Sequence, residues 1–497
     1  MPTRFKQSKQ TTYPIVCSLV FLLFFAKTSS PIYLYYYGHD SSFYSIMGQA
    51  LNSGKVMYRD YFDLKGPLLF FWEALGQRII PGRGGVFLLE SIAILATTLI
   101  LCHICDFYLL SNNKRIFLFS VFFYIYASTL WGGNTVEEYV LPLSLGCLYM
   151  FFKWDKHKEK IRFYPLLFGL FFSICLFSKL TCAIFICSIA LTIAFILITN
   201  RRYLDLLRCI IMFTTGVAVI ALPILLYYHN KGVLTNMIFW CFILASKRGT
   251  AASYSPTDIN KINWFLMSCP CILAMVYSFI LRKRQRTISL LLIISSILQF
   301  IILQLGSPFI YYLTAQLPLI ILILVIFCSQ IPELYNTKSI ALFNKRLHTL
   351  FIVILGSLFL CVSFFPFFIK ELDTDLKLSL NGTGITYNTG YTALGGLIPK
   401  EERDDIMCLN FGTRFFAANS LLPANKYPIN YMLFGALCPE VRKETISEIS
   451  NKEYKWIFWE LSDDSGAFSD EELLAILDKN YEEYCNYGKR MFLYKKR

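Results

Sequence analysis

The sequence predicts an all-α polytopic membrane bundle of about eleven transmembrane helices, followed by a small α/β domain. Two observations support this fold class. Of the 497 residues, 56% are hydrophobic and only 16% are charged, whereas about a quarter of the residues in a soluble protein are charged. The hydrophobic residues also form blocks of roughly 16 to 22, near the ~20 residues that a helix needs to cross a bilayer. Barrel strands would instead alternate polar with apolar residues.

Eleven hydrophobic blocks follow one another along the chain. The predicted spans are about 13–34, 86–110, 116–131, 138–152, 164–178, 180–199, 209–228, 262–281, 287–305, 309–329 and 349–369. The first block follows three basic residues and runs into the aromatic stretch Tyr33–Tyr37 without a small-residue cleavage site. We therefore expect an uncleaved first span with a cytoplasmic N-terminus.

The net charge of +14 belongs to the membrane part of the chain. Residues 1–369 carry 31 Lys and Arg against 13 Asp and Glu, whereas residues 370–497 carry 16 against 20. The basic excess lies mostly in short loops that all fall on the side of the N-terminus, as the positive-inside rule requires. The charge therefore reports topology and excludes nucleic acid as the expected partner. The change in charge balance at residue 369 also divides the chain into a transmembrane domain, 1–369, and an extracytoplasmic domain, 370–497.

The first outer loop, residues 35–85, carries two helical patterns. Apolar residues recur with helical spacing from Phe43 to Leu51, after Ser41 and Ser42 as caps and before Gly54 as a stop. This pattern predicts an amphipathic helix on the membrane surface. A second helix is expected to begin at Pro67, because proline suits the first turn.

The C-terminal domain alternates strand and helix patterns. The predicted strands are 405–411, 455–461 and 489–495, and the predicted helices are 412–422, 439–450 and 469–479. This alternation is typical of a small α/β fold.

Acidic residues at the outer ends of spans are the first candidates for catalysis, because ionisable groups at the membrane are rare. Asp40 is either a general base at the membrane face or a helix-start residue stabilised by the helix dipole. Asp60 is either a site residue or a loop acid paired with Arg59 or Lys65. Thr135 and Glu138 fit a capping box, which leaves Glu137 free to face a site.

Two lysines are candidates for binding an anion. Lys65 precedes Gly66 and Pro67, and a cation beside a helix N-terminus suggests that an anion binds both. Lys179 marks an outer turn, where it either reaches the headgroups or contacts a phosphate. By contrast, the C-x-x-C spacing at Cys102 lies in an apolar span without a second ligand pair, so we assign no metal ligands.

In their order along the chain, these segments resemble the GT-C membrane glycosyltransferases, in the branch of protein O-mannosyltransferases and lipid A aminoarabinose transferases. The resemblance rests on Asp40 with Tyr44, Tyr58-Arg59-Asp60, Lys65-Gly66-Pro67-Leu68, the turn Gly132–Tyr139, the stretch from Gly169 to Lys179, and Tyr311-Tyr312 with Pro318. It covers most of the chain, including the C-terminal domain that many bacterial members append.

The resemblance implies transfer of a sugar from a polyprenyl-phosphate carrier to a glycan, lipid or protein acceptor at the outer face of a bacterial inner membrane. It implies Asp40 as the catalytic base and Glu137 as a supporting or acceptor-positioning acid. The implied substrate-binding residues are Lys65, Lys179, Arg59, Asp60, Tyr311 and Tyr312. The sequence identifies no cofactor with certainty, and participation of a divalent metal is left open.

The alternative function is a transporter or lipid flippase without catalytic activity. It predicts charged groups along a path in mid-span, whereas most charges here gather at the outer face and only Glu90 and Asp106 lie well within spans. We therefore favour the glycosyltransferase.

Overall fold

The computed structural model describes residues 2–33, 37–156, 163–247, 258–305, 309–330, 365, 368–370, 372–374, 376, 385–410, 412–428, 431–461, 470–488 and 490–497. The chain forms two compact units. The helical unit comprises Met1–Ala26, Leu89–Ile224 and Pro256–Asp375. The sheet unit comprises Lys27–Leu88, Leu225–Ser255 and Leu376–Arg497, so it joins the first outer loop to most of the C-terminal domain.

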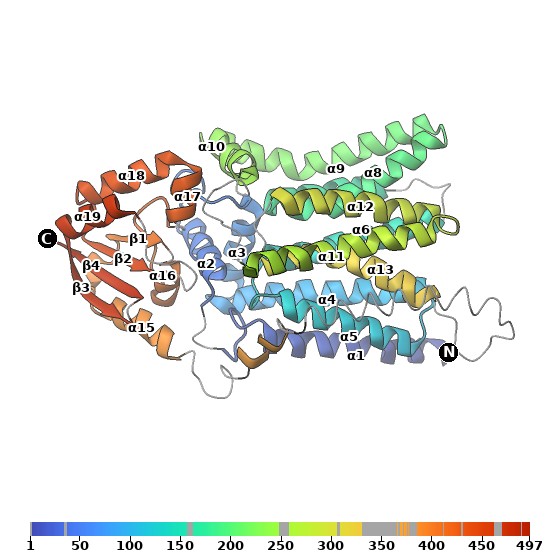
Figure 1. Ribbon diagram of the computed structural model, residues 1–497, viewed down its shortest axis with the longest axis horizontal. Coiled ribbons are helices and arrows are strands. Elements are labelled where there is room, and N and C mark those ends of the chain that lie inside the picture. The colour runs from blue at the N-terminus through green and yellow to red at the C-terminus, as the bar shows by residue number, and fades with distance from the viewer. Residues whose placement is uncertain are drawn as a thin grey trace. The chain divides into compact units, whose positions relative to one another are not determined.

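Helices make up the described part of the helical unit, and Figure 1 shows α1, α4, α5, α6, α11 and α12 running in roughly the same direction. The elements are α1 Pro2–Phe25, α4 Arg83–Phe107, α5 Asn112–Thr129, α6 Val136–Lys156, α7 Tyr164–Ser178, η1 Leu180–Ala183, α8 Ile184–Thr199, α9 Tyr203–Asn230, α11 Asp258–Leu281, α12 Arg286–Leu305, η4 Ile310–Gln316 and α13 Leu317–Gln330. They correspond to ten of the eleven predicted blocks, although α1 ends at Phe25 whereas the predicted first span ran to residue 34. The eleventh, 349–369, lies outside the described residues except for 365, 368 and 369.

Six helical segments among the described residues are long and apolar enough to cross a membrane. They are Arg83–Phe107, Leu180–Thr199, Tyr203–Asn230, Trp264–Leu281, Arg286–Leu303 and Ile310–Gln330. The chain is therefore an integral membrane protein, while the total of eleven crossings stays a prediction.

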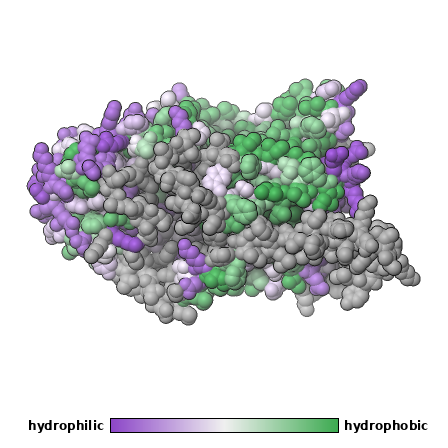
Figure 2. Space-filling model, in the orientation of Figure 1, coloured by the Kyte–Doolittle hydropathy of each residue, from purple (hydrophilic) through white to green (hydrophobic). Residues whose placement is uncertain are grey.

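Helix α9 packs through small residues and leaves its apolar side chains exposed. A Cβ at Gly169 would lie 2.0 Å from the carbonyl oxygen of Phe213, and one at Gly216 would lie 2.0 Å from that of Leu166. Only glycine permits this approach of α7 and α9, as in many membrane helix pairs. Leu204 and Leu222 on α9 are exposed, and Figure 2 shows apolar residues gathered over this helix. A lipid environment suits such a surface.

The sheet unit contains a four-stranded sheet in the order β1-β2-β4-β3. The strands are β1 Ile406–Asn410, β2 Trp456–Glu460, β3 Tyr481–Tyr487 and β4 Met491–Lys496. β1 pairs with β2 in parallel, and the other pairs are antiparallel. The C-terminal helical elements are α15 Ile385–Gly396, η5 Lys400–Glu402, α16 Thr413–Asn419, α17 Tyr431–Leu437, α18 Pro439–Ser450 and α19 Glu471–Asn480.

The predicted α/β pattern of the C-terminal domain is confirmed, but the sequence analysis did not predict the strand β3. This edge strand buries little beyond Tyr481, so it lacks apolar alternation.

Two helices form in the first outer loop, α2 His39–Asn52 and α3 Pro67–Ile79. α3 begins at Pro67 as predicted. α2 begins earlier than expected: Gly38 is its N-cap and no side chain caps it, so the assignment of Ser41 and Ser42 as caps was wrong. Ile46 and Met47 on its apolar face are fully buried, and α2 packs against α3 and α16. That face is therefore covered by protein.

The first outer loop is fixed to the C-terminal domain by hydrogen bonds and aromatic packing. The Tyr61 hydroxyl donates to the carbonyl oxygen of Pro423 over 2.6 Å. The Phe62 ring lies 5.2 Å from both Trp240 and Tyr427, measured between ring centroids. Trp240 belongs to the third outer segment, which contains α10 Leu234–Ile238 and η2 Phe239–Leu244. Three segments distant in sequence thus form one support for the loop.

Candidate functional site

Asp40 lies in the first turn of α2, with its side chain 43% exposed. The Tyr44 hydroxyl, one turn further on, donates a 3.1 Å hydrogen bond to Oδ2 of Asp40. The helix dipole stabilises a negative charge at this position. Asp40 is thus a helix-start acid and also an accessible carboxylate. The structural role and the role of general base are therefore compatible at this position.

Lys65 meets Asp40 at the start of α3. Its Nζ lies 3.8 Å from Oδ2 of Asp40, 3.7 Å from Oδ2 of Asp63 and 4.9 Å from the centre of the Tyr44 ring. Lys65 precedes Gly66, the N-cap of α3, as predicted. The Lys65 side chain is 13% exposed and that of Asp63 only 4%. Asp63 therefore provides a buried counter-charge for Lys65, while Asp40 remains the more accessible acid.

Tyr58 sets the backbone position of Lys65. Its hydroxyl donates to the Lys65 carbonyl oxygen over 2.7 Å, and the Asn236 side chain donates to the Tyr58 carbonyl oxygen over 3.1 Å. Tyr58 is fully buried with a φ of 64°, a strained conformation for a bulky residue. Burial, with smaller contributions from Cys241 and Tyr228, raises the pKa of its hydroxyl well above the usual value, so the hydroxyl remains a donor. The sequence pattern predicted no role for Tyr58, because its hydroxyl reaches Lys65 across the loop and its carbonyl partner, Asn236, comes from a distant segment.

His39 precedes Asp40 and lies near a cation of the C-terminal domain. Burial and the charge of Arg414 lower the pKa of His39 to about 3, against the opposite effect of Asp40. The imidazole is therefore neutral at physiological pH. Arg414 belongs to α16, and its guanidinium pairs with the buried Glu460 at the end of β2. The C-terminal domain thus contributes charge close to the start of α2.

Arg59 and Asp60 pair with each other. The guanidinium donates to both carboxylate oxygens of Asp60, over 3.1 and 3.0 Å, and the Val56 N–H donates to Oδ2 over 2.7 Å. Burial opposes ionisation of Asp60, but these hydrogen bonds leave its pKa below the usual value. Asp60 is therefore ionised and paired with Arg59, the first of its two predicted partners. Lys65 instead pairs with Asp40 and Asp63.

Lys179 and Glu137 form a buried ion pair in the helical unit. Lys179 Nζ donates to Oε1 of Glu137 over 2.5 Å. The same ammonium lies 3.8 Å from the centre of the Tyr312 ring and 5.1 Å from that of Tyr311. The Lys179 and Glu137 side chains are 11% and 1% exposed. The structure therefore brings these four predicted residues together, and Glu137, which does not serve as the capping-box acid, faces Lys179.

A turn of left-handed residues precedes Glu137. Trp131, Gly132, Gly133 and Asn134 have φ between 55° and 88°. The Glu90 carboxylate accepts from the Asn134 N–H and stabilises the turn. Glu138 accepts from the Thr135 N–H over 2.8 Å, as a capping-box acid does, and from the Tyr126 hydroxyl over 3.1 Å.

The two mid-span acids that a transport path would use have structural partners. Glu90 binds the turn at Asn134, and Asp106 accepts from the Arg115 guanidinium over 2.5 Å. Within the described ranges, no group of three or more His, Cys, Asp or Glu side chains could hold a metal ion. The predicted site residues thus fall into two groups, one around Asp40 and Lys65 in the sheet unit and one around Lys179 in the helical unit.

No family model matches the sequence, and no curated protein matches it. The fold is similar to that of the archaeal oligosaccharyltransferase AglB from Archaeoglobus fulgidus, solved with an inhibitory peptide and a dolichol-phosphate. The TM-score is 0.53 at 11% identity, over 100% of this chain and 74% of the other. An Archaeoglobus fulgidus oligosaccharyltransferase tethered with an acceptor peptide containing the NVT sequon gives a TM-score of 0.49 at 12% identity, over 98% and 74% of the two chains. A complex of that enzyme with Zn and sulfate gives 0.45 at 14%, over 97% and 73%. The likeness to AglB shows that the two chains share their fold, in agreement with the predicted membrane-glycosyltransferase architecture.

Proposed function

We propose that this chain is a membrane glycosyltransferase that moves a sugar from a polyprenyl-phosphate carrier to an acceptor at the outer face of the membrane. The observation that carries the proposal is the half-exposed Asp40 carboxylate, held by Tyr44 beside the Lys65 ammonium at the start of α3. A base and a cation at an anion-attracting helix end suit attack on a sugar phosphate. The similar AglB structure contains a dolichol-phosphate, which is a carrier of this class.

In the proposed reaction, Asp40 removes a proton from the acceptor nucleophile. The nucleophile forms a new bond to the anomeric carbon of the sugar, and the bond from that carbon to the carrier phosphate breaks. Negative charge then develops on the departing phosphate, where Lys65 and the N-terminal dipole of α3 stabilise it.

Lys179 is a second proposed ligand for the carrier phosphate. Its ammonium lies over the aromatic rings of Tyr311 and Tyr312, in a cation–π arrangement. Glu137 has a positioning role, because its carboxylate fixes Lys179. Arg59 and Asp60 are proposed to contact the acceptor, since their side chains are 50% and 25% exposed.

The proposed location is a bacterial inner membrane, with a cytoplasmic N-terminus and the C-terminal domain outside. A membrane-impermeant reagent applied to intact cells is expected to label a tag placed after Arg497, because every basic loop falls on the N-terminal side. A tag labelled only after the inner membrane is opened would contradict this topology.

The proposed reaction can be measured in vesicles that contain the purified chain and a polyprenyl phosphate linked to a hexose. We expect release of the unglycosylated carrier when an acceptor peptide, glycolipid or glycan is added, and no release without an acceptor. Movement of the intact glycosylated carrier between leaflets, with no release for any acceptor class, would instead identify a flippase.

A further inference from the structure

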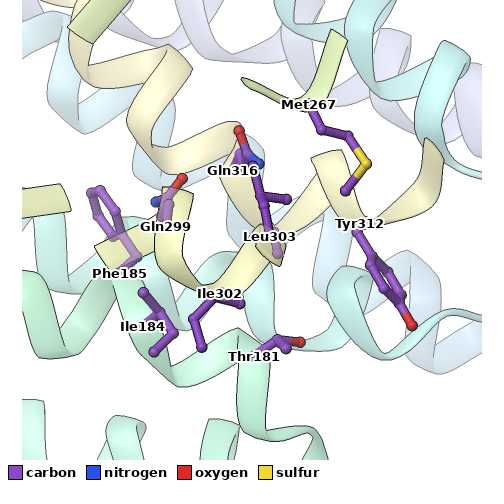
Figure 3. Close-up of a pocket in the computed structure, with 10 residues that line it drawn as sticks. Thr181, Ile184, Phe185, Met267, Gln299, Ile302, Leu303, Tyr312 and Gln316 are labelled. Atoms are coloured by element: carbon purple, nitrogen blue, oxygen red, sulfur yellow. The ribbon is translucent and has the colours of Figure 1, made fainter. Parts of the chain in front are cut away.

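A cavity inside the helical unit has about 490 Å³ of empty space, counting its open mouth. Figure 3 shows side chains from η1, α8, α11, α12 and η4 around it. The lining residues are Thr181, Ile184, Phe185, Met267, Gln299, Ile302, Leu303, Tyr312, Ala315 and Gln316. Its walls are mostly apolar with a few polar groups, which is the kind of lining common in small-molecule sites.

Two glutamines distinguish this cavity from an ordinary packing defect. Gln299 is 6% exposed and Gln316 is 3% exposed. Neither amide oxygen nor either amide nitrogen of the pair has a hydrogen-bond partner within the described part of the chain. A buried amide without a partner is destabilising in apolar surroundings, so both side chains need a polar partner.

The chemistry of the lining selects the kind of ligand. Each amide offers both donors and an acceptor, and the Thr181 and Tyr312 hydroxyls do the same. Among the described residues that line the cavity, none carries a charge. A phosphate would lack a counter-charge here, and an isoprenoid tail would leave the amides without partners. A sugar ring satisfies both parts of the wall, since its hydroxyls pair with amides and its C–H faces pack on apolar and aromatic side chains.

Tyr312 connects this cavity to the Lys179 ion pair. Its ring is part of the cavity wall, and the Lys179 ammonium lies 3.8 Å from the ring centre. A cation therefore lies next to a neutral, hydrogen-bonding cavity. A sugar joined to a phosphate has the matching arrangement, with an anionic group attached to a neutral ring of hydroxyls.

From this juxtaposition we infer that Gln299 and Gln316 bind the glycosyl group of the carrier, and that they give the protein its preference for the glycosylated over the unglycosylated carrier. This inference rests on the proposed function and extends it to sugar recognition.

The test compares Gln299→Leu and Gln316→Leu with the parent protein. Leucine keeps side-chain bulk and suits the apolar wall, but it removes the hydrogen bonds. The probes are unglycosylated polyprenyl phosphate and the same carrier bearing glucose, mannose, galactose or N-acetylglucosamine. The matched control is Gln285→Leu, which precedes α12 and does not line the cavity.

We expect the parent and Gln285→Leu to bind at least one glycosylated carrier about tenfold more tightly than the unglycosylated carrier. Each cavity variant should lose most of that preference while binding the unglycosylated carrier as the parent does, which also shows that it is folded. Gln316→Asn, whose amide is one methylene shorter, should give an intermediate loss if the leucine variant is poorly expressed.

Two results would overturn the inference. One is an unchanged preference in both cavity variants, which would mean that the amides bind only water. The other is a parent protein without preference for any of the four sugars. Failure of the proposed function has a different signature, because the parent would then bind both forms of carrier without transferring sugar to any acceptor.

Discussion

Replacing Asp40 with asparagine is expected to lower the rate of sugar transfer by about 100-fold or more, the usual scale for loss of a general base. Asparagine keeps the shape of the side chain and still accepts the hydrogen bond from Tyr44. It also suits a helix start, so the variant should fold, insert and bind the carrier. The measurement is the initial rate of release of unglycosylated polyprenyl phosphate from its hexose conjugate in vesicles.

Asp478→Asn provides the matched control, because Asp478 is an exposed aspartate of α19 in the same unit. Its rate should equal that of the parent. Tyr44→Phe removes one hydrogen bond to Asp40 and should cause a smaller loss than Asp40→Asn. A near-parent rate for Asp40→Asn would place the base elsewhere, with Glu137 or Asp60 as the next candidate.

Replacement of Lys179 is expected to affect both stability and carrier binding. Lys179→Met leaves the buried Glu137 carboxylate without its partner, which costs about 3–5 kcal/mol in comparable buried pairs. The same substitution removes the proposed ammonium–phosphate hydrogen bond, which should weaken carrier binding by roughly 1–3 kcal/mol. Thermal unfolding and the dissociation constant for polyprenyl phosphate measure the two effects separately.

The double variant Lys179→Met/Glu137→Gln separates a structural role from a binding role. It removes both charges of the pair, so it should regain most of the stability of the parent. If Lys179 binds the phosphate, carrier binding should remain weak in this stable protein. Recovery of parent affinity together with stability would show that Lys179 is structural only.

Lys65→Ala is the parallel test in the sheet unit, with an expected loss of roughly 1–3 kcal/mol in carrier binding.

Local sequence patterns determined much of the fold. Hydrophobic blocks of spanning length predicted ten of the helices now described, because crossing a bilayer sets both length and composition. Pro67 marked the start of α3, and Thr135 with Glu138 marked the start of α6, because a helix end needs particular residues within one turn. The strands β1 and β2 were predicted because both are fully buried and rich in apolar residues.

Only the tertiary structure decided which of the candidate residues meet. Lys179 pairs with Glu137, 42 residues away in the sequence, and Asp40 shares Lys65 with Asp63. Sequence patterns report spacing within one element and carry no information on which elements become neighbours. The same limit explains why Tyr58 was not assigned as the support of Lys65, and why the amides of Gln299 and Gln316 stood out only once the helices around them were packed. For this protein, the sequence by itself determined the membrane bundle, the C-terminal α/β pattern and the residue types of the site. Packing between distant segments decided their partners, because burial and charge pairing depend on the neighbours that folding supplies.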